Sequence, residues 1–301
     1  MFQKFIIERD YHNSRLDKWF KAKVLNIPQS LIEKIIRKKK IKVNKKKTKT
    51  SYRVQINDTI EVFNISEIKP NNLKKNTNKY KASKKEKKTY GDFIIEDNDN
   101  FIVINKPSGI PVQGGTRSFK NITDLLSSTK YFENKKPYIV HRLDKETSGV
   151  LIIAKNREYA QLFTSLFRIR KIHKNYLAIV HGEIPKSKRT LEDNLVSYQN
   201  NKKVIQKAIT HLKILKSSEK YSLLELKPIT GRKHQLRKQL LNLGNPVVGD
   251  NKYSVNKFIK FKKNNNLMLH ASKLKFMINN IKYNFEAKYN QEFDNLIKKQ
   301  F

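Results

Sequence analysis

The chain has 301 residues, a length that predicts two domains, each able to bury a core of its own. Hydrophobic residues make up 38% of it, which excludes wholesale disorder. No apolar run reaches the roughly 18 residues that span a bilayer, and none near the N-terminus has the length of a signal peptide. The chain has no cysteine, which excludes disulfides, cysteine zinc sites and a thiol nucleophile. We therefore expect a cytoplasmic protein without a membrane partner.

The charge of the chain is strongly positive. Lys and Arg number 65 against 26 Asp and Glu, a formal net charge of +39. Such an excess is typical of a protein that binds a polyanion, so nucleic acid is the first partner to consider. A compositional explanation competes with this one, because Lys, Asn and Ile are abundant throughout, as an AT-rich genome would produce.

Residues 1–64 are predicted to form a small unit of two helices and short strands. Ser14 is placed to cap the first helix, and Ser30 and Glu33 have capping-box spacing at the start of the second, after Pro28. The apolar face of the first helix carries Leu16, Trp19, Phe20 and Val24, and that of the second Leu31, Ile32, Ile35 and Ile36. Hydrophobic residues then alternate as in short strands: Ile41, Val43, Val54, Ile56, Ile60 and Val62.

A basic run crosses this unit. Residues 34–49 contain ten Lys or Arg and no acid. We expect four of these lysines to contact RNA phosphates: Lys38, Lys40, Lys45 and Lys47. The alternative is an ordinary solvated surface, since exposed lysines are common.

The stretch 14–63 resembles the small αL-type RNA-binding domain of a ribosomal small-subunit protein and of RNA-modifying enzymes. The matching parts are the Arg-Leu-Asp opening, the Ile-Arg-Lys turn and the Lys-Val-Asn strand. The family often has Gly after the second helix, where this chain has Lys39. Because a non-Gly residue in the left-handed region costs about 1 to 2 kcal/mol, we expect a turn of different shape here.

Residues 65–90 are predicted to be a basic linker. The part from 69 onwards holds nine Lys and one Glu with almost no aliphatic side chains, so it buries too little surface to order itself. All nine glycines lie at or beyond Gly91, which also separates the two units in composition.

Residues 91–301 are predicted to form the second unit, an α+β domain with a mixed, largely antiparallel sheet. Asn156 is expected to cap a helix that carries Ala160, Phe163, Leu166 and Phe167 on its apolar face. Six runs read as strands: 93–96, 101–105, 138–143, 150–155, 176–180 and 221–227. The helices are too few for one crossover per strand, which argues against a doubly wound fold.

Charged residues gather between two of these strands, in the segment that contains His141, Arg142, Asp144 and Glu146. A turn there can project side chains into a cleft, although an ordinary charged hairpin has the same composition. In an extended backbone the two carboxylates share a face, as the pair of a retaining glycosidase does. No phosphate-binding or dinucleotide-binding glycine motif and no two-histidine metal motif is present, so we expect neither a cofactor nor a metal.

Three motifs follow one another in the second unit: HRLDKETSG at 141–149, KNYLAIVHG at 174–182 and TGRKHQLRKQLLNLGNPVVGD at 230–250. NKPSGIPVQGG lies upstream of them, and LHASKLKF at 269–276 lies downstream. Together these segments resemble the RluA family of pseudouridine synthases. The coupling to an αL-type domain and the loop from Pro107-Ser108-Gly109 through Gly114-Gly115 most resemble the C branch of large-subunit enzymes, although the D branch shares the same domain order.

The resemblance implies a role for each matching residue. Asp144 corresponds to the catalytic aspartate, ionised and paired with Arg237. Tyr176 corresponds to the tyrosine that stacks on the target base and is implicated in the final proton removal. Arg142 corresponds to the side chain that fills the space left by the extracted uridine. Two further residues are expected to contact phosphate or shape the pocket: Arg232 and His234. A further position, 239, has Gln where many relatives have His, a change we expect to be tolerated.

The activity implied is the isomerisation of specific uridines in large-subunit ribosomal RNA to pseudouridine, by a monomer acting without a cofactor on a flipped-out base. Free RNA and an assembly intermediate both remain open as the substrate. So does the path of the aspartate, by attack on the sugar or the base or by proton removal from the ribose. Two other functions compete: hydrolysis of a nucleoside or RNA glycosidic bond by Asp144 and Glu146, and non-catalytic binding of ribosomal RNA.

Overall fold

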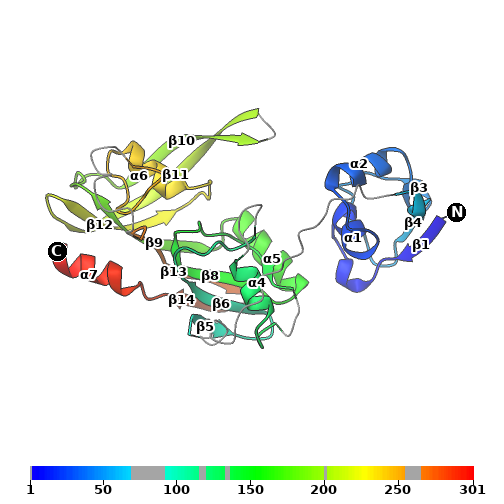
Figure 1. Ribbon diagram of the computed structural model, residues 1–301, viewed down its shortest axis with the longest axis horizontal. Coiled ribbons are helices and arrows are strands. Elements are labelled where there is room, and N and C mark those ends of the chain that lie inside the picture. Colours follow the sequence, from blue (N-terminus) through cyan, green and yellow to red (C-terminus); the bar gives the residue numbers. More distant parts are fainter. Residues whose placement is uncertain (1, 69–91, 115–119, 133–135, 200–201, 255–265) are drawn as a thin grey trace. The chain divides into compact units, whose positions relative to one another are not determined.

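The computed structural model describes residues 2–68, 92–114, 120–132, 136–199, 202–254 and 266–301 (Figure 1). The chain divides into two compact units, Met1–Thr77 and Asn78–Phe301. None of the helices in the described ranges is long and apolar enough to cross a membrane.

The described part of the N-terminal unit packs two helices on a four-stranded antiparallel sheet of order β1-β4-β2-β3. Its elements are β1 (Phe2–Ile6), α1 (Leu16–Lys23), α2 (Gln29–Arg37), β2 (Ile41–Val43), β3 (Lys46–Lys47) and β4 (Thr59–Phe63), with 3-10 turns at Arg9–Tyr11 and Ile65–Glu67. The predicted apolar faces of both helices contribute to one core, with Leu16, Phe20 and Ile32 fully buried. Of the predicted strand residues, Val54 is buried outside a strand and Ile56 is exposed.

Both predicted helix caps in this unit are wrong. The cap of α1 is Arg15, because the Leu16 N–H donates to the Tyr52 carbonyl and so needs no serine oxygen. Helix α2 starts at Gln29, directly after Pro28, whose carbonyl accepts the first helical hydrogen bonds. Ser30 therefore lies inside the first turn, where it has no capping position.

The turn after α2 keeps the left-handed geometry, so the expectation of a different shape at Lys39 is wrong. Lys39 has a φ of +61°. The N–H groups of Lys39 and Lys40 donate to the carbonyls of Ile36 and Ile35, the bond pattern of a Schellman motif. These two bonds, and the burial of Ile41 directly after them, offset the strain of about 1 to 2 kcal/mol at a non-glycine residue.

The predicted linker, residues 65–90, lies mostly outside the described residues. Its first residues do not: Ile65 begins a 3-10 turn, and Ile68, on the same side of that turn, is buried against the N-terminal core. The core of this unit therefore extends beyond residue 64, because two isoleucines three residues apart have apolar surface to bury.

The described part of the second unit is a ten-stranded sheet, largely antiparallel, with helices on it, which confirms the predicted fold class. The main order is β10-β11-β12-β9-β13-β8-β6-β5, with β14 paired to β13 and β7 to β8; the β13–β8 pair is parallel. The strands are β5 (Ile94–Asp97), β6 (Phe101–Lys106), β7 (Tyr138–Ile139), β8 (Ser148–Ala154), β9 (His173–His181), β10 (Thr190–Gln199), β11 (Lys202–Ser217), β12 (Tyr221–Pro228), β13 (Leu269–Ile278) and β14 (Ile281–Glu286). The helices are α4 (Ile122–Ser127), α5 (Arg157–Arg168), α6 (Gln235–Asn242) and α7 (Gln291–Gln300).

The helices cover both faces of the sheet. Alternate residues of β6 face opposite sides: Phe101 and Val103 pack with Phe163 of α5, and Ile102 and Ile104 pack in the cluster that holds Ile122 of α4. Helix α5 begins at the predicted cap, where the Asn156 side chain accepts from the Tyr159 N–H.

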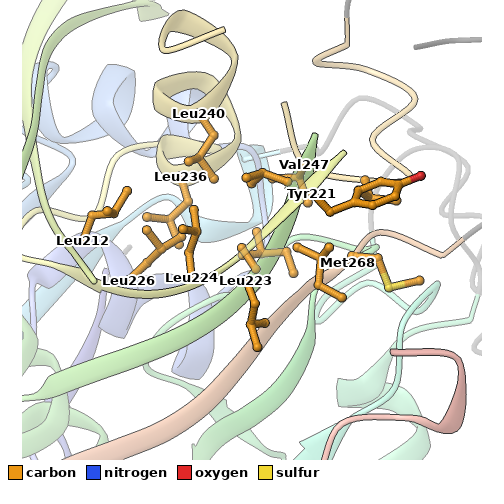
Figure 2. Packing of buried hydrophobic residues seen from close by; sticks show 14 of the residues in the cluster. Leu212, Tyr221, Leu223, Leu224, Leu226, Leu236, Leu240, Val247 and Met268 are labelled. Carbon is orange, nitrogen blue, oxygen red and sulfur yellow. The ribbon is translucent and has the colours of Figure 1, made fainter. Parts of the chain in front are cut away.

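Helix α6 is fixed to the sheet by leucines. Leu236 and Leu240 point from α6 toward Leu212, Leu224 and Leu226 of the strands beneath (Figure 2). This packing fixes the rotation of α6 about its axis and therefore the direction of Arg237, the residue between them.

The parallel contact between β8 and β13 depends on Gly149, which pairs with Ala271 and has a φ of +112°. A Cβ at this position would lie 2.2 Å from the Ala271 carbonyl oxygen. We expect Gly149→Ala to lower the free energy of unfolding by more than about 4 kcal/mol, measured by urea denaturation. Gly244→Ala is the control: Gly244 has a φ of +89° but nothing within 4 Å of its Cβ position, so strain alone should cost about 1 to 2 kcal/mol. Equal losses of unfolding free energy in the two variants would contradict the close approach of Gly149 to the Ala271 backbone.

Candidate active site

A cleft of about 1160 Å³ opens in the second unit. Its walls come from the loop before β8, the start of β9, the loop between β12 and α6, and α6 itself. Asp144 is the one acidic residue among the described residues that line it, whereas nine lining residues are Lys or Arg. The lining includes every site residue predicted in this unit: Arg142, Asp144, Tyr176, Arg232, His234 and Arg237. The cleft is therefore a cationic site built around a single carboxylate.

The loop that carries Asp144 is held as a turn. The Thr147 N–H donates to the Asp144 carbonyl, and the Ser108 hydroxyl donates to the Glu146 carbonyl. Because residues 144–147 form a turn between β7 and β8, the premise that Asp144 and Glu146 share a face of an extended strand is wrong. Glu146 is not among the residues that line the cleft.

A buried lysine fixes the same loop from below. Lys106, with 0% of its surface exposed, donates from Nζ to the carbonyls of Pro107, Ile110 and Lys145, at 2.7, 2.9 and 3.0 Å. Burial lowers the pKa of Lys106 to about 7, while the nearby Glu146 and Asp144 carboxylates raise it. The NKPSG segment thereby ties the backbone beside Asp144 to the end of β6.

Arg237 lies between two aspartates. Its Nη1 is 3.5 Å from Asp144 Oδ2, within ion-pair distance. Its closer partner is Asp250: Nε and Nη2 donate to the two carboxylate oxygens of Asp250 at 2.7 and 2.8 Å. The same carboxylate accepts the N–H groups of Lys252 and Tyr253. Asp250 therefore fixes the Arg237 guanidinium through two hydrogen bonds, and the remaining nitrogen, Nη1, is directed at Asp144.

His234 and Tyr253 close a ring of contacts around this pair. His234 Nδ1 is 2.8 Å from the Tyr253 hydroxyl, and Nε2 is 3.7 Å from Asp144 Oδ1. The Tyr253 ring covers the Arg237 guanidinium at 5.1 Å. Burial lowers the pKa of His234, although Asp144 raises it, so the imidazole is neutral at pH 7. His234 thus shapes the pocket beside Asp144.

Tyr176, on β9, lines the cleft and packs against the hydrophobic core. Burial, together with the Asp144 carboxylate, raises the pKa of its phenol above the usual value of 10. The side chain is therefore a neutral, apolar platform with a hydroxyl at its end.

Comparisons with known proteins identify the family of the chain. Residues 100–242 match the family described as RNA pseudouridylate synthase, and residues 14–60 match the S4 domain. The Ribosomal large subunit pseudouridine synthase C of Buchnera aphidicola subsp. Baizongia pistaciae is 34% identical over 287 residues, covering 90% of this chain and 88% of the relative. The chain belongs to the RNA pseudouridylate synthase family. Its resemblance to RluA-type isomerases is thereby confirmed.

Further relatives of this pseudouridine synthase include the Ribosomal large subunit pseudouridine synthase C of Rickettsia felis, 36% identical over 277 residues that cover 87% of this chain and 88% of the relative. Among solved structures, Human RNA Pseudouridylate Synthase Domain Containing 4 is 28% identical with a TM-score of 0.59. That match covers 70% of this chain and 94% of the human one.

Two of the other residues predicted for this pseudouridine synthase, Arg142 and Arg232, line the cleft without joining the ring around Asp144. Arg142 is exposed on the cleft wall, and Arg232 Nε donates to the Lys207 carbonyl. The four predicted phosphate contacts, Lys38, Lys40, Lys45 and Lys47, lie in the N-terminal unit, three of them exposed and Lys40 half-buried. Gln239 is buried and bonds to Thr210 and Asp193, joining α6 to the β10–β11 pair.

Sequence reasoning missed three residues of the site: Lys106, Asp250 and Tyr253. Asp250 ends the motif GNPVVGD, and Lys106 begins the KPSG motif, so both stand inside segments that the family resemblance had already singled out. Among the described residues, no group of three or more His, Asp or Glu is placed to hold a metal ion.

Proposed function

We propose that the protein converts specific uridines of large-subunit ribosomal RNA to pseudouridine, as a monomer in the cytoplasm. The observation that carries this proposal is the cationic cleft, in which Asp144 is the single acidic residue among the described lining residues. The choice of RNA substrate is supported by the names of the relatives, which are ribosomal large subunit pseudouridine synthases.

The reaction needs one carboxylate and no external redox agent. The bond between the ribose C1′ and N1 of uracil breaks, the base turns, and C5 joins the same sugar carbon. The proton leaves C5 and N1 gains one, so neither oxidant nor reductant is needed. Asp144 acts by attack on the sugar or the base, or by removing a ribose proton. Arg237 pairs with the carboxylate and orients it.

Tyr176 provides the surface on which the uracil stacks. Because its raised pKa keeps the phenol neutral at pH 7, Tyr176 accepts the C5 proton only if it passes its own proton on. Stacking is thus the role that the burial of Tyr176 supports best. Arg142, exposed at the cleft wall, fills the space that the flipped uridine leaves in the RNA.

Product analysis tests the proposal. The full-length protein is incubated with a large-subunit ribosomal RNA transcript. The RNA is then digested to nucleosides, which are separated and quantified by chromatography. Pseudouridine is the expected product. Free uracil with abasic sites would instead establish a hydrolase, and unchanged RNA with retained binding would establish a non-catalytic RNA-binding protein.

The lysines of the N-terminal unit give a separate prediction. If Lys38, Lys40, Lys45 and Lys47 each contact one phosphate, replacing all four by Gln lowers the slope of log affinity against log salt by about 3, at 0.7 to 0.9 per contact. The turnover number at saturating RNA should change little, because the cleft residues are intact. Binding is measured by filter retention at several salt concentrations.

The matched control replaces three other exposed lysines of the same unit, Lys4, Lys18 and Lys21, by Gln. This control should leave the slope nearly unchanged. If each removed charge changed the salt slope equally in the two variants, the lysines would act only through the net charge of the unit and not through specific phosphate contacts.

A further inference from the structure

Two lysines of the second unit have a pKa lowered by burial, and their surroundings differ. Lys106 is fully enclosed and donates to three carbonyls. Lys174 lines the cleft, and within the described part of the chain no hydrogen bond or ion pair is found for its ammonium. Lys174 is therefore a half-buried cation without a partner, in the wall of the cleft.

The position of Lys174 is set by β9. Lys174 stands two residues before Tyr176, so the two side chains leave the same face of the strand, with their Cα atoms about 6.6 Å apart. The Lys174 ammonium lies beside Gly231, 3.8 Å from where a Cβ of that residue would be. Gly231 and its neighbours in the loop before α6 form the adjoining cleft wall.

The charged groups near Lys174 do not neutralise the positive charge of its ammonium. Burial alone lowers its pKa; no carboxylate raises it, so Asp144 does not serve as its counter-ion. On the contrary, Lys174 lowers the pKa of His141, and Arg170, Arg232 and Lys233 line the same cleft. Withdrawing a cation from water without an anion is costly, and an anionic ligand removes that cost.

We propose that Lys174 binds a backbone phosphate of the RNA, next to the nucleotide whose base stacks on Tyr176. This inference rests on the proposed function, since it takes the cleft to hold a flipped nucleotide. One pleat of β9 separates the Cα atoms of Tyr176 and Lys174, so the two side chains can hold the base and a neighbouring phosphate of one nucleotide. A phosphate at this point satisfies the cation and sets the depth to which the nucleotide enters the cleft.

The test compares Lys174→Met with Lys171→Met in the full chain. Lys171 is three residues away, exposed and not among the cleft-lining residues, so its replacement removes the same charge without removing the site. Affinity for a fragment of large-subunit ribosomal RNA that carries a mapped target uridine should fall about 10- to 100-fold for Lys174→Met, and its salt slope by about 0.7 to 0.9. Lys171→Met should change neither appreciably.

A double-mutant cycle locates the phosphate. Single methylphosphonate replacements, which are uncharged, are placed on either side of the target uridine in the RNA fragment. Wild-type protein should lose affinity at one of these positions, and Lys174→Met should lose nothing further there, because the contact is already absent. Additive losses at every position overturn the proposal, as do equal losses for the two lysine variants.

Two further measurements distinguish a misfolded variant from a variant that has lost the phosphate contact. Thermal unfolding confirms that Lys174→Met is folded, and Lys174→Arg, which retains a cation, should recover most of the affinity. If the variant does not fold, the methylphosphonate scan with wild-type protein decides: no sensitive position beside the target uridine overturns the proposal. Absence of pseudouridine with wild-type protein contradicts the proposed function itself, whereas pseudouridine formation with no sensitive phosphate beside the target uridine contradicts only the role of Lys174.

Discussion

Replacing Asp144 by asparagine is expected to abolish pseudouridine formation, with a loss of turnover on the order of 10⁴-fold or more. The amide has the shape of the carboxylate but is neither a nucleophile nor a base. The fold should survive, because Arg237 keeps its bidentate pair with Asp250 when the weaker contact to Asp144, at 3.5 Å, is lost. Binding of RNA should be retained or tightened, since the variant removes a negative charge from a cationic cleft.

Glu146→Gln is the matched control for this variant. Glu146 is two residues away and its carboxylate is 4.0 Å from the same Arg237 nitrogen, but it does not line the cleft. Turnover should fall less than about 10-fold. Retained turnover in Asp144→Asn would remove Asp144 from the mechanism. Complete loss in both variants would favour a two-carboxylate mechanism, such as that of a glycosidase.

The sequence motifs predicted the members of the cleft but not how they are held. HRLDKETSG, KNYLAIVHG and TGRKHQLR are each local, and the sheet brings all three to one cleft. The partner of Arg237 depends on the rotation of α6 and on the turn at Gly249, neither of which a linear motif specifies. The resemblance therefore indicated Asp144 as the partner, whereas the closer contact is to Asp250.

The errors at the helix starts have a different cause. Ser14 and Ser30 have the residue types that capping requires, but the backbone satisfies the first helical N–H groups at Leu16 and after Pro28. At Lys39, local propensity disfavours the left-handed turn, and the hydrogen bonds of the Schellman motif outweigh that preference. In each case long-range or backbone contacts, which a local pattern does not contain, decided the conformation.

The long β10–β11 pair was not predicted, although a signal for it exists. In β11, buried Ala208, Thr210 and Leu212 alternate with Lys207, His211 and Lys213, the period of a half-buried strand. Frequent lysines reduce the hydrophobicity of the run. Periodicity identifies this strand better than hydrophobic content does.

Arg237→Ala is expected to lower the free energy of unfolding by about 3 to 5 kcal/mol, as well as to reduce turnover. The Asp250 side chain is 0% exposed, and without Arg237 its carboxylate keeps, among the described residues, only the two N–H donors of Lys252 and Tyr253. A buried charge then loses its counter-ion. Tyr253 also loses the guanidinium beneath its ring, so His234 should become less well ordered.

Urea denaturation of three variants tests this expectation. Asp250→Asn should cost a similar amount, because Arg237 then retains only the longer contacts to Asp144 and Glu146. Arg232→Ala is the control from the same cleft: the residue is half-buried and Nε donates to one carbonyl without a buried carboxylate as partner, so the loss should stay below about 1 kcal/mol. Arg237→Lys separates charge from geometry. Lysine keeps the positive charge but not the bidentate fork, so a variant with near-normal stability and low turnover would show that Asp250 serves mainly to direct Arg237 at Asp144.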